Sequence, residues 1–380
     1  MELYVFNQDV ELLGIVDEIE EMEWSRRYYE GGSCLIKALL TDNNISLLKK
    51  GNLICKKDDL SDVMYIEHRE LSDEDADGME LLVVEGISLT TRILSSRITL
   101  GRQIEKGTAD KIMENMLLAQ TNNHSNKKRH IKRLTVDTSK KDDFVDVYEH
   151  NSLYKYLSDE FVAISTLDGC GYRIRLDVDK KVFVFEVYKG KDISNKIIFS
   201  TAFDNLTNQE YIESDSNYKN VGIIAGQGEE EDRDLIIYND EEYADLDRLE
   251  LFIDARDIEK DKRIIQKPNE DGEMKDVEEP IYNGEKAVKL LQERAKEKLE
   301  ETSQVKSYTA SITGNNYVYR EDYELGDIVT VRNDKWDILY SDRIIEINET
   351  YSDEGMTIDI EFGKELPTLA KKINQKIGRI

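Results

Sequence analysis

The chain has 380 residues, which predicts two or three domains at roughly 150 residues each. Its 80 acidic residues outnumber its 52 basic ones, so the formal net charge is −28 at pH 7. A field of this sign repels phosphates, which excludes stable nucleic-acid binding and disfavours an anionic membrane surface. The chain lacks a long apolar run and a signal-peptide pattern at its N-terminus, so we expect cytoplasmic synthesis, no membrane insertion and no export by a signal peptide.

The first hundred residues predict a β-rich unit with one short helix. Two short apolar segments, at 2–6 and 12–16, indicate a β-hairpin at the start of the chain. The turn signal Glu30-Gly31-Gly32 separates two further strands, and Thr41 is expected to cap a short helix with Gly51 at its C′ position. The remaining strands are expected at 53–55, 63–69 and 79–85.

The middle of the chain alternates helical and strand patterns. Thr108 is expected to cap a helix over 109–120, and the strand pattern is expected to return from Phe161. Alternating residues predict a hairpin around Lys180-Lys181 and a second one around an acidic turn. The second hairpin, a polar excursion and a one-sided helix are expected at 221–238, 257–283 and 284–302.

The last 75 residues give the clearest strand pattern in the chain. Met356, Ile358, Ile360 and Phe362 alternate with polar residues behind the turn 352–355, which predicts a half-buried antiparallel sheet. The fold class we expect is therefore α+β and β-rich.

Motifs that carry chemistry are few. Cys34, Cys55 and Cys170 form no CxxC pair, which predicts reduced and buried thiols. The run Asp73-x-Asp75-x-Asp77-Gly78 matches half of a calcium loop, but its twelfth position is Val84 where a Glu is required. A solvated turn and a weak cation site at Asp73 to Asp77 both remain open. The common signatures of acyl transfer and nucleotide binding do not occur, so we predict no catalytic residues, cofactor or metal.

A basic stretch at 121–133 stands out in this acidic chain. His124 and His130 flank Lys127-Lys128-Arg129. The stretch is too short for a nucleic-acid site and lacks interleaved aromatic residues. A mobile basic loop and a contact with a phosphate or a partner are the two interpretations.

Several segments, in order along nearly the whole chain, resemble a family of siphovirus tail proteins. The resemblance is carried by MELYVFNQDVELLGIVDEIEEMEWSRRYYEGGSCLIKA, GYRIRLDVDKKVFVFEVYKGKD, FSTAFDNLTNQEYIESDSNYKNVGIIAGQGEEEDR, ELFIDARDI and YELGDIVTVRN. These are baseplate hub or tail-tip proteins, similar in fold to the hub of the contractile T-even phage baseplate.

The resemblance implies a structural hub, usually a homotrimer, that forms a ring with an axial channel for DNA ejection. Two tube-forming, β-barrel-like domains would span residues 1–105 and 304–380, with an interleaved α/β region at 106–303 decorating the outside. The implied partners are the tail tube or distal tail protein, the spike or fibre protein, and the tape measure protein. The implied location is the tail tip or baseplate of a phage or a tailocin.

Six residues are candidates for assembly or turn positions, namely Trp24, Arg26, Tyr28, Tyr29, Gly326 and Asp327. The first four lie in WSRRYY, and the last two match the family's YxLGD motif at a strand start. Core aromatics and an ordinary turn are the alternatives. A folded Trp24→Ala variant that lost its trimer would favour an interface.

Two other functions remain open at this point: a receptor- or carbohydrate-binding tail module that uses a Tyr-rich surface, and a cell-wall hydrolase built on a carboxylate pair. The second is the weaker of the two, because the chain stops at Ile380, just after the last predicted strand. The resemblance therefore brings no appended peptidase or hydrolase domain with it.

Overall fold

The structure, a computed structural model, describes residues 1–57, 59–72, 80–137, 139, 144, 146–268, 273–302, 304–314, 316–353 and 355–363. The chain divides into two compact units. Unit 1 comprises Met1–Tyr211 and Ser307–Ile380, and unit 2 comprises Ile212–Lys306. Unit 2 is therefore an insertion in the sequence of unit 1.

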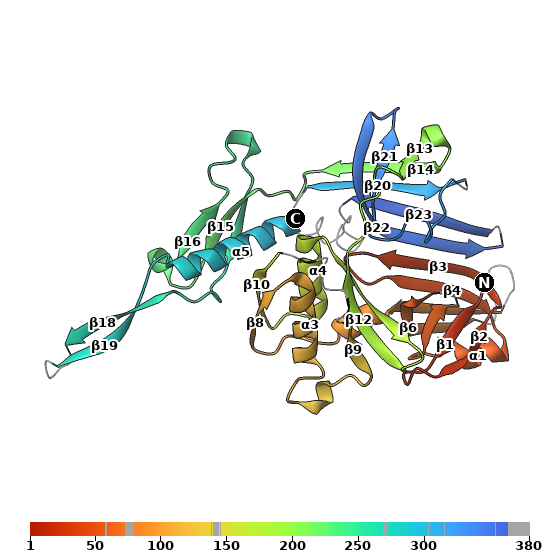
Figure 1. The fold of residues 1–380 in the computed structure, drawn as a ribbon, viewed down its shortest axis with the longest axis horizontal. Coiled ribbons are helices and arrows are strands. Elements are labelled where there is room, and N and C mark those ends of the chain that lie inside the picture. Colours follow the sequence, from red (N-terminus) through yellow and green to blue (C-terminus); the bar gives the residue numbers. More distant parts are fainter. Residues whose placement is uncertain are drawn as a thin grey trace. The chain divides into compact units, whose positions relative to one another are not determined.

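Unit 1 is built around a 13-stranded sheet (Figure 1). Its central path runs β14-β20-β23-β22-β3-β4-β7-β6-β5-β1-β2, and β21 joins β13 to β22. The strands of this sheet are β1 (Leu3–Phe6), β2 (Leu12–Val16), β3 (Ile19–Arg27), β4 (Ser33–Leu39), β5 (Leu53–Lys56), β6 (Asp59–Ser72), β7 (Leu81–Ser88), β13 (Ile198–Ser200), β14 (Leu206–Ser214), β20 (Val305–Ile312), β21 (Ile328–Asn333), β22 (Ile338–Ser352) and β23 (Gly355–Gly363).

The described residues of unit 1 also form two smaller sheets and four α-helices. One sheet pairs β8 with β10, and the other has the order β11-β12-β9. These elements are β8 (Arg102–Gly107), β9 (Leu134–Val136), β10 (Tyr148–Leu153), β11 (Gly171–Asp177), β12 (Val182–Tyr188), α1 (Asp42–Leu47), α2 (Leu89–Leu94), α3 (Ala109–Gln120) and α4 (Leu157–Asp168), with single 3₁₀ turns at Lys127–Arg129 and Thr201–Phe203. The helix α3 buries Ile112, Met116 and Leu117 against α4 and β12, as its apolar spacing predicts.

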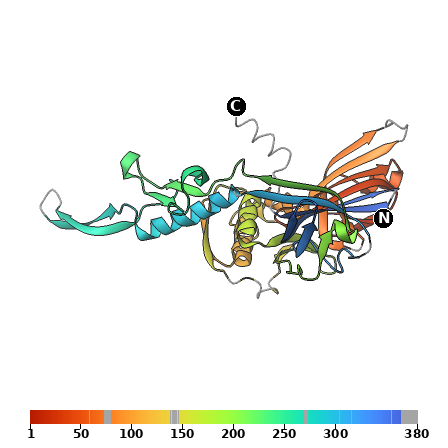
Figure 2. The same cartoon turned by 90° about the horizontal axis from the view of Figure 1, so that it is seen from above.

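The described residues of unit 2 form a three-stranded sheet, a helix and a hairpin. The sheet has the order β16-β15-β17, and α5 packs on it through Leu291 and Ala295. Its elements are β15 (Val221–Ala225), β16 (Leu235–Tyr238), β17 (Glu250–Asp254), β18 (Lys262–Pro268), β19 (Met274–Pro280) and α5 (Glu285–Glu301), with 3₁₀ turns at Glu230–Asp232 and Asp245–Asp247. Within this unit the β18–β19 hairpin extends beyond the N-terminal end of α5 in both views (Figures 1 and 2).

The α+β, β-rich fold class is confirmed, and so are most of the predicted elements. The opening hairpin is β1–β2, and the alternation around Lys180-Lys181 forms the hairpin β11–β12. The acidic turn joins β15 to β16, and the one-sided helix is α5. The C-terminal alternation forms β22–β23. The expected tube-like division at 1–105, 106–303 and 304–380 concerns the assembled particle and stays a prediction.

Three local predictions were wrong. Residues from Phe161 continue the helix α4, because Leu157, Phe161 and Ile164 recur at helical spacing and are all buried. A second short helix, α2, follows β7 within the first hundred residues. The helix α1 ends at Leu47, so Gly51 is not its C′ residue; its φ of +94° turns the chain into β5 instead.

Other expectations concern single residues. The three cysteines are free and buried, as predicted. The candidate cation site at Asp73 to Asp77 lies outside the described residues. Within the described ranges, no group of three His, Cys, Asp or Glu side chains could hold a metal ion. No helix there is long and apolar enough to cross a membrane.

Candidate functional site

The central feature of unit 1 is a seam between the two ends of the chain. β3 pairs antiparallel with β22, from Arg27 opposite Glu346 to Met22 opposite Tyr351. Strands from the first ninety residues and from the last sixty are therefore hydrogen-bonded into one continuous sheet (Figure 1). Because these strands share one sheet and one compact unit, the seam joins the two distant segments into one structural body.

One face of the sheet at the seam is packed and the other is polar. Trp24, Ile36, Ile347 and Ile360 point to the packed face and are fully buried. The alternate positions are half-buried or exposed and carry mainly hydroxyl, amide and carboxylate groups. We call this surface the open face; it comprises Thr309, Ser311, Thr357, Asp359, Glu361, Glu346, Asn348, Thr350, Glu21, Glu23, Ser25, Arg27, Ser33, Leu35, Lys37, Val83, Glu85 and Ile87.

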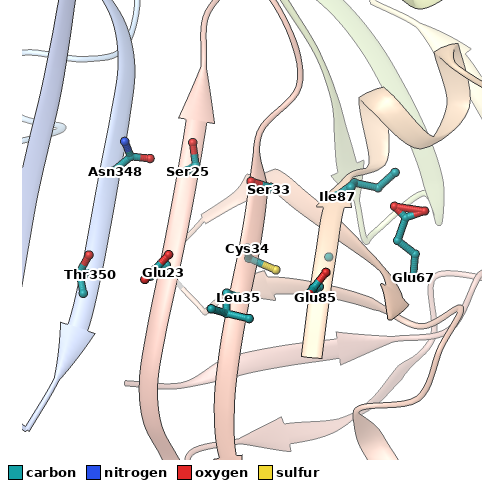
Figure 3. Close-up of a pocket in the computed structure, with 11 residues that line it drawn as sticks. Glu23, Ser25, Ser33, Cys34, Leu35, Glu67, Glu85, Ile87, Asn348 and Thr350 are labelled. Atoms are coloured by element: carbon teal, nitrogen blue, oxygen red, sulfur yellow. The ribbon is translucent and has the colours of Figure 1, made fainter. Parts of the chain in front are cut away.

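The open face is hollowed at the seam (Figure 3). The concavity has a volume of about 360 Å³, and Asn348 and Thr350 on β22 face Ser25 and Glu23 on β3 across it. Its other acidic residues are Glu67 and Glu85, and no Lys or Arg occurs among the described residues that line it. The concavity is thus an open, negatively charged surface, and Ser25 at its edge donates to Glu346 at 3.0 Å.

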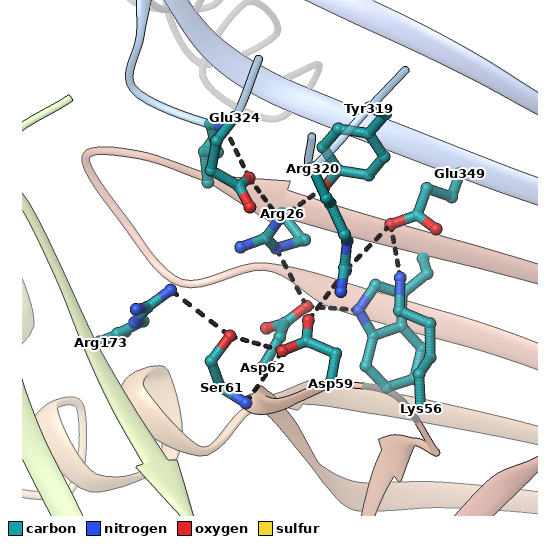
Figure 4. A network of polar contacts seen from close by, with 12 residues as sticks. Arg26, Lys56, Asp59, Ser61, Asp62, Arg173, Tyr319, Arg320, Glu324 and Glu349 are labelled. Carbon is teal, nitrogen blue, oxygen red and sulfur yellow. Dashed lines mark hydrogen bonds and ion pairs between the residues drawn. The ribbon is translucent and has the colours of Figure 1, made fainter. Parts of the chain in front are cut away.

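A buried ionic network lies behind the seam (Figure 4). Arg26 is only 5% exposed, and its guanidinium contacts Glu324 at 2.7 Å and Asp62 at 3.5 Å. Arg26 also donates to the Tyr319 hydroxyl, and the Trp24 indole donates to Asp62. Because Arg26 and Asp62 lie near the N-terminus and Tyr319 and Glu324 near the C-terminus, these contacts tie the two segments together.

A second group of charges extends the network. Arg320 contacts Asp59 at 2.8 Å and Glu349 at 3.6 Å. The Lys56 ammonium pairs with Glu349 and lies 5.3 Å from the centre of the Trp24 ring. Lys56, Asp59 and Glu349 are all buried, so water screens these interactions poorly.

The two aspartates of the network have opposite pKa shifts. For Asp59, burial alone would raise the pKa, but Arg26 and Arg320 outweigh it and bring the pKa down to about 2. For Asp62, burial raises the pKa and prevails over the opposing effect of Arg26. Burial disfavours the charged form of Lys56 as well, which lowers the pKa of this ammonium group, although Glu349 opposes the change. The network therefore depends on its charged partners being present together.

Asp59→Asn is expected to weaken folding in a pH-dependent way. A carboxyl group whose pKa is lowered by folding stabilises the native state above its unfolded pKa, and this contribution disappears as the pH falls through about 4 to about 2. The difference in unfolding free energy between wild type and variant should therefore be about 2 kcal/mol larger at pH 7 than at pH 2. Denaturant titrations across this range measure it. The exposed Asp179→Asn serves as the control, and equal pH profiles for both variants would contradict the assignment.

A second buried contact centres on Tyr28. Its hydroxyl accepts from the Gly190 backbone N–H at 3.1 Å and lies 3.2 Å from the Gly169 carbonyl oxygen, to which it donates. Gly326 has a φ of +94°, and a Cβ atom there would lie 2.2 Å from the Tyr28 ring. Asp327 accepts from the Lys191 backbone N–H at 2.7 Å and from that of Glu324 at 3.0 Å. The expected turn at Gly326-Asp327, before β21, therefore contacts two segments that are distant in the sequence, one around Tyr28 and one around Lys191.

The candidate residues from the sequence lie in these two clusters. Trp24, Arg26 and Tyr28 are buried within unit 1, and the half-buried Tyr29 packs edge-on against Tyr28 with the ring centres 5.1 Å apart. Their burial agrees with the interpretation as core residues, and direct participation in assembly stays a prediction. The same holds for Gly326 and Asp327.

Sequence reasoning missed the other charged and hydroxyl groups of the buried ionic network around Arg26. They are Lys56, Asp59, Asp62, Tyr319, Arg320, Glu324 and Glu349. A usable signal existed for Glu349, which follows Ile347 by two residues in a strand and so shares its buried face. The others lie at strand ends or in loops, where alternation gives no information.

The fold is similar to that of solved tail proteins. It is similar to the 43 kDa tail protein of prophage MuSo2 from Shewanella oneidensis, with a TM-score of 0.57, 12% identity and coverage of 96% of this chain and 98% of that one. It is also similar to a tail protein from Neisseria meningitidis MC58, with a TM-score of 0.56, 12% identity and coverage of 96% of each chain.

The family follows from the sequence match. The model of the Siphovirus ReqiPepy6 Gp37-like protein family matches residues 2–364, so the chain belongs to that family. A comparison with curated protein sequences gave no significant match. The family match over residues 2–364 confirms the resemblance to siphovirus tail proteins.

Proposed function

We propose that the chain is a structural baseplate hub or tail-tip protein that assembles as a trimeric ring with an axial channel. The observation that carries this proposal is the seam. It joins strands from residues 1–105 and 304–380 into one continuous sheet with a polar open face. Two tube-like β segments per copy would give six around a threefold ring, which matches a sixfold tail tube.

In this proposal the open face lines the channel. Its carboxylates outnumber its cations, and Arg27 and Lys37 are both paired with glutamates on neighbouring strands. A negatively charged lining repels the phosphates of passing DNA, whereas a basic lining would retain them. The packed face behind it keeps the wall rigid through the buried network.

The proposed partners are the tail tube or distal tail protein on one side and the spike or fibre protein on the other, with the tape measure protein in contact during assembly. The proposed location is the tail tip of a phage or of a phage-tail-like particle. We propose a structural and not an enzymatic function.

Assembly of the purified chain at high protein concentration tests the proposal. Negative-stain images are expected to show threefold rings with a central hole, and light scattering should give three times the mass of one chain. Persistent monomers alone and with the cognate tube protein would contradict it. Sugar or peptide release from purified cell walls would contradict the non-enzymatic function.

A further inference from the structure

The basic stretch at 121–133 belongs to a longer basic region of unit 1. This basic region, residues 89–133, is described without a gap and has ten basic and three acidic residues, in a chain whose net charge is −28. Two of its three carboxylates, those of Asp110 and Glu114, pair with Lys111. The region is therefore a locally cationic part of an acidic protein.

A pocket of about 510 Å³ lies beside this basic region. Its apolar walls come from β5, β6, α2, β12 and the loop before β9, through Leu53, Tyr65, Leu89, Ile93, Phe183 and Ile131. Three cations, Arg92, Arg97 and Lys132, line it as well, together with the carboxylate of Asp9. The pocket thus offers apolar surface and positive charge side by side.

Neutral groups hold the two arginines of the pocket. The Arg92 guanidinium lies over the Tyr65 ring, 4.7 Å from its centre. Arg97 donates to the Arg129 carbonyl oxygen at 3.0 and 3.2 Å, and the Arg129 guanidinium donates to the Ile98 carbonyl oxygen at 2.7 Å. Among the residues that the structure describes, no carboxylate forms an ion pair with any of these three arginines. Burial and the nearby charge of Arg129 accordingly lower the pKa of Arg97.

The carboxylate of Asp9 leaves these charges uncompensated. It lies 3.3 Å from the Arg133 guanidinium and 3.8 Å from the Lys132 ammonium. Asp9 therefore offsets the charge on the Lys132 side of the pocket, and the side formed by Arg92 and Arg97 stays positive. An anionic ligand is attracted to that side.

We propose that this pocket binds a short acidic segment of a partner protein, whose carboxylates pair with Arg92 and Arg97 while an adjacent apolar side chain packs against the apolar walls. Charge interactions are screened beyond about 8 Å at physiological salt, so the cations of the pocket act on a short segment more strongly than distant carboxylates do. A long polyanion such as nucleic acid would extend past the basic region onto acidic surface, where it is repelled. The inference goes beyond the proposed function, because it concerns each single copy of the chain and not the ring.

Fluorescence polarisation with the full-length chain tests the pocket. The probe is a labelled six-residue peptide of glutamate and leucine, and two control peptides replace every glutamate by glutamine or every leucine by glycine. Arg92→Gln is the test variant, because Arg92 is exposed and its replacement should leave the fold intact. Lys128→Gln is the matched control, because Lys128 is an exposed cation of the same basic region outside the pocket lining.

We expect saturable binding of the probe, weakened about tenfold by Arg92→Gln and less than about twofold by Lys128→Gln. Each control peptide should bind at least about fivefold more weakly than the probe, because one lacks the charges and the other the apolar side chains. Equal losses in the two variants, or no saturable binding of the probe, would overturn the inference. Tighter binding of a single-stranded oligonucleotide of equal charge would overturn it in favour of a nucleic-acid contact. The proposed ring would stand in each case, because its assembly is measured separately.

Discussion

We expect Arg26→Met to lower the free energy of unfolding by about 3–5 kcal/mol, because removing one charge of a buried ionic network leaves the opposite charges there uncompensated. Arg26 is 5% exposed and contacts Asp62 and Glu324. Methionine fills a similar volume but cannot neutralise the buried Asp62 carboxylate. Denaturant unfolding measures the change, with fluorescence of the fully buried Trp24 reporting on the same region.

The matched control is Arg263→Met. Arg263 also pairs with a glutamate, at 2.7 Å, but its side chain is 63% exposed. Exposed pairs contribute about 0–1 kcal/mol, so the control should change the unfolding free energy by no more than that. Similar small effects of both variants would show that the network behind the seam contributes little to stability.

Gly326→Ala is the second substitution with a large expected effect. The residue has a φ of +94°, which strains any residue with a Cβ atom, and the added methyl group would overlap the buried Tyr28 ring. Strain and overpacking each cost about 1–3 kcal/mol, so we expect a loss of about 2–5 kcal/mol in unfolding free energy. Thermal and denaturant unfolding both measure it.

Gly101→Ala separates the two causes. Gly101 also has a positive φ, +76°, but a Cβ atom there would have no neighbour within 4 Å. This variant should therefore show only the cost of strain, about 1 kcal/mol. If Gly326→Ala costs no more than Gly101→Ala, the close packing of the turn against Tyr28 does not stabilise the protein.

Local patterns in the sequence were sufficient for elements whose partners are near in the chain. The hairpin β11–β12 follows from alternation on both sides of a two-lysine turn, and α5 follows from an apolar stripe on a polar helix. The segment that forms α4 resembles a strand in the sequence because Val162 and Ala163 join Phe161 and Ile164 into a continuous apolar run. Such a run hides the helical period.

Long-range contacts left little local signal. The seam pairs Trp24 with Glu349, more than three hundred residues away, and no spacing in the sequence records that pairing. Arg26 was a candidate from the resemblance alone, although its alternation with Met22 and Trp24 already placed it on a buried face. A buried arginine requires buried acidic partners, but with 80 acidic residues in the chain only the three-dimensional structure identifies Asp62 and Glu324.

An electron cryomicroscopy reconstruction of the assembled particle would show which surface of the chain lines the channel. We expect a threefold ring in which the open face of β22, β3 and β4 lines the axial channel, with Glu23 and Asn348 pointing to its lumen. A ring whose lumen is lined mainly by lysine and arginine, or one in which this face lies on the outside, would contradict the proposed channel lining.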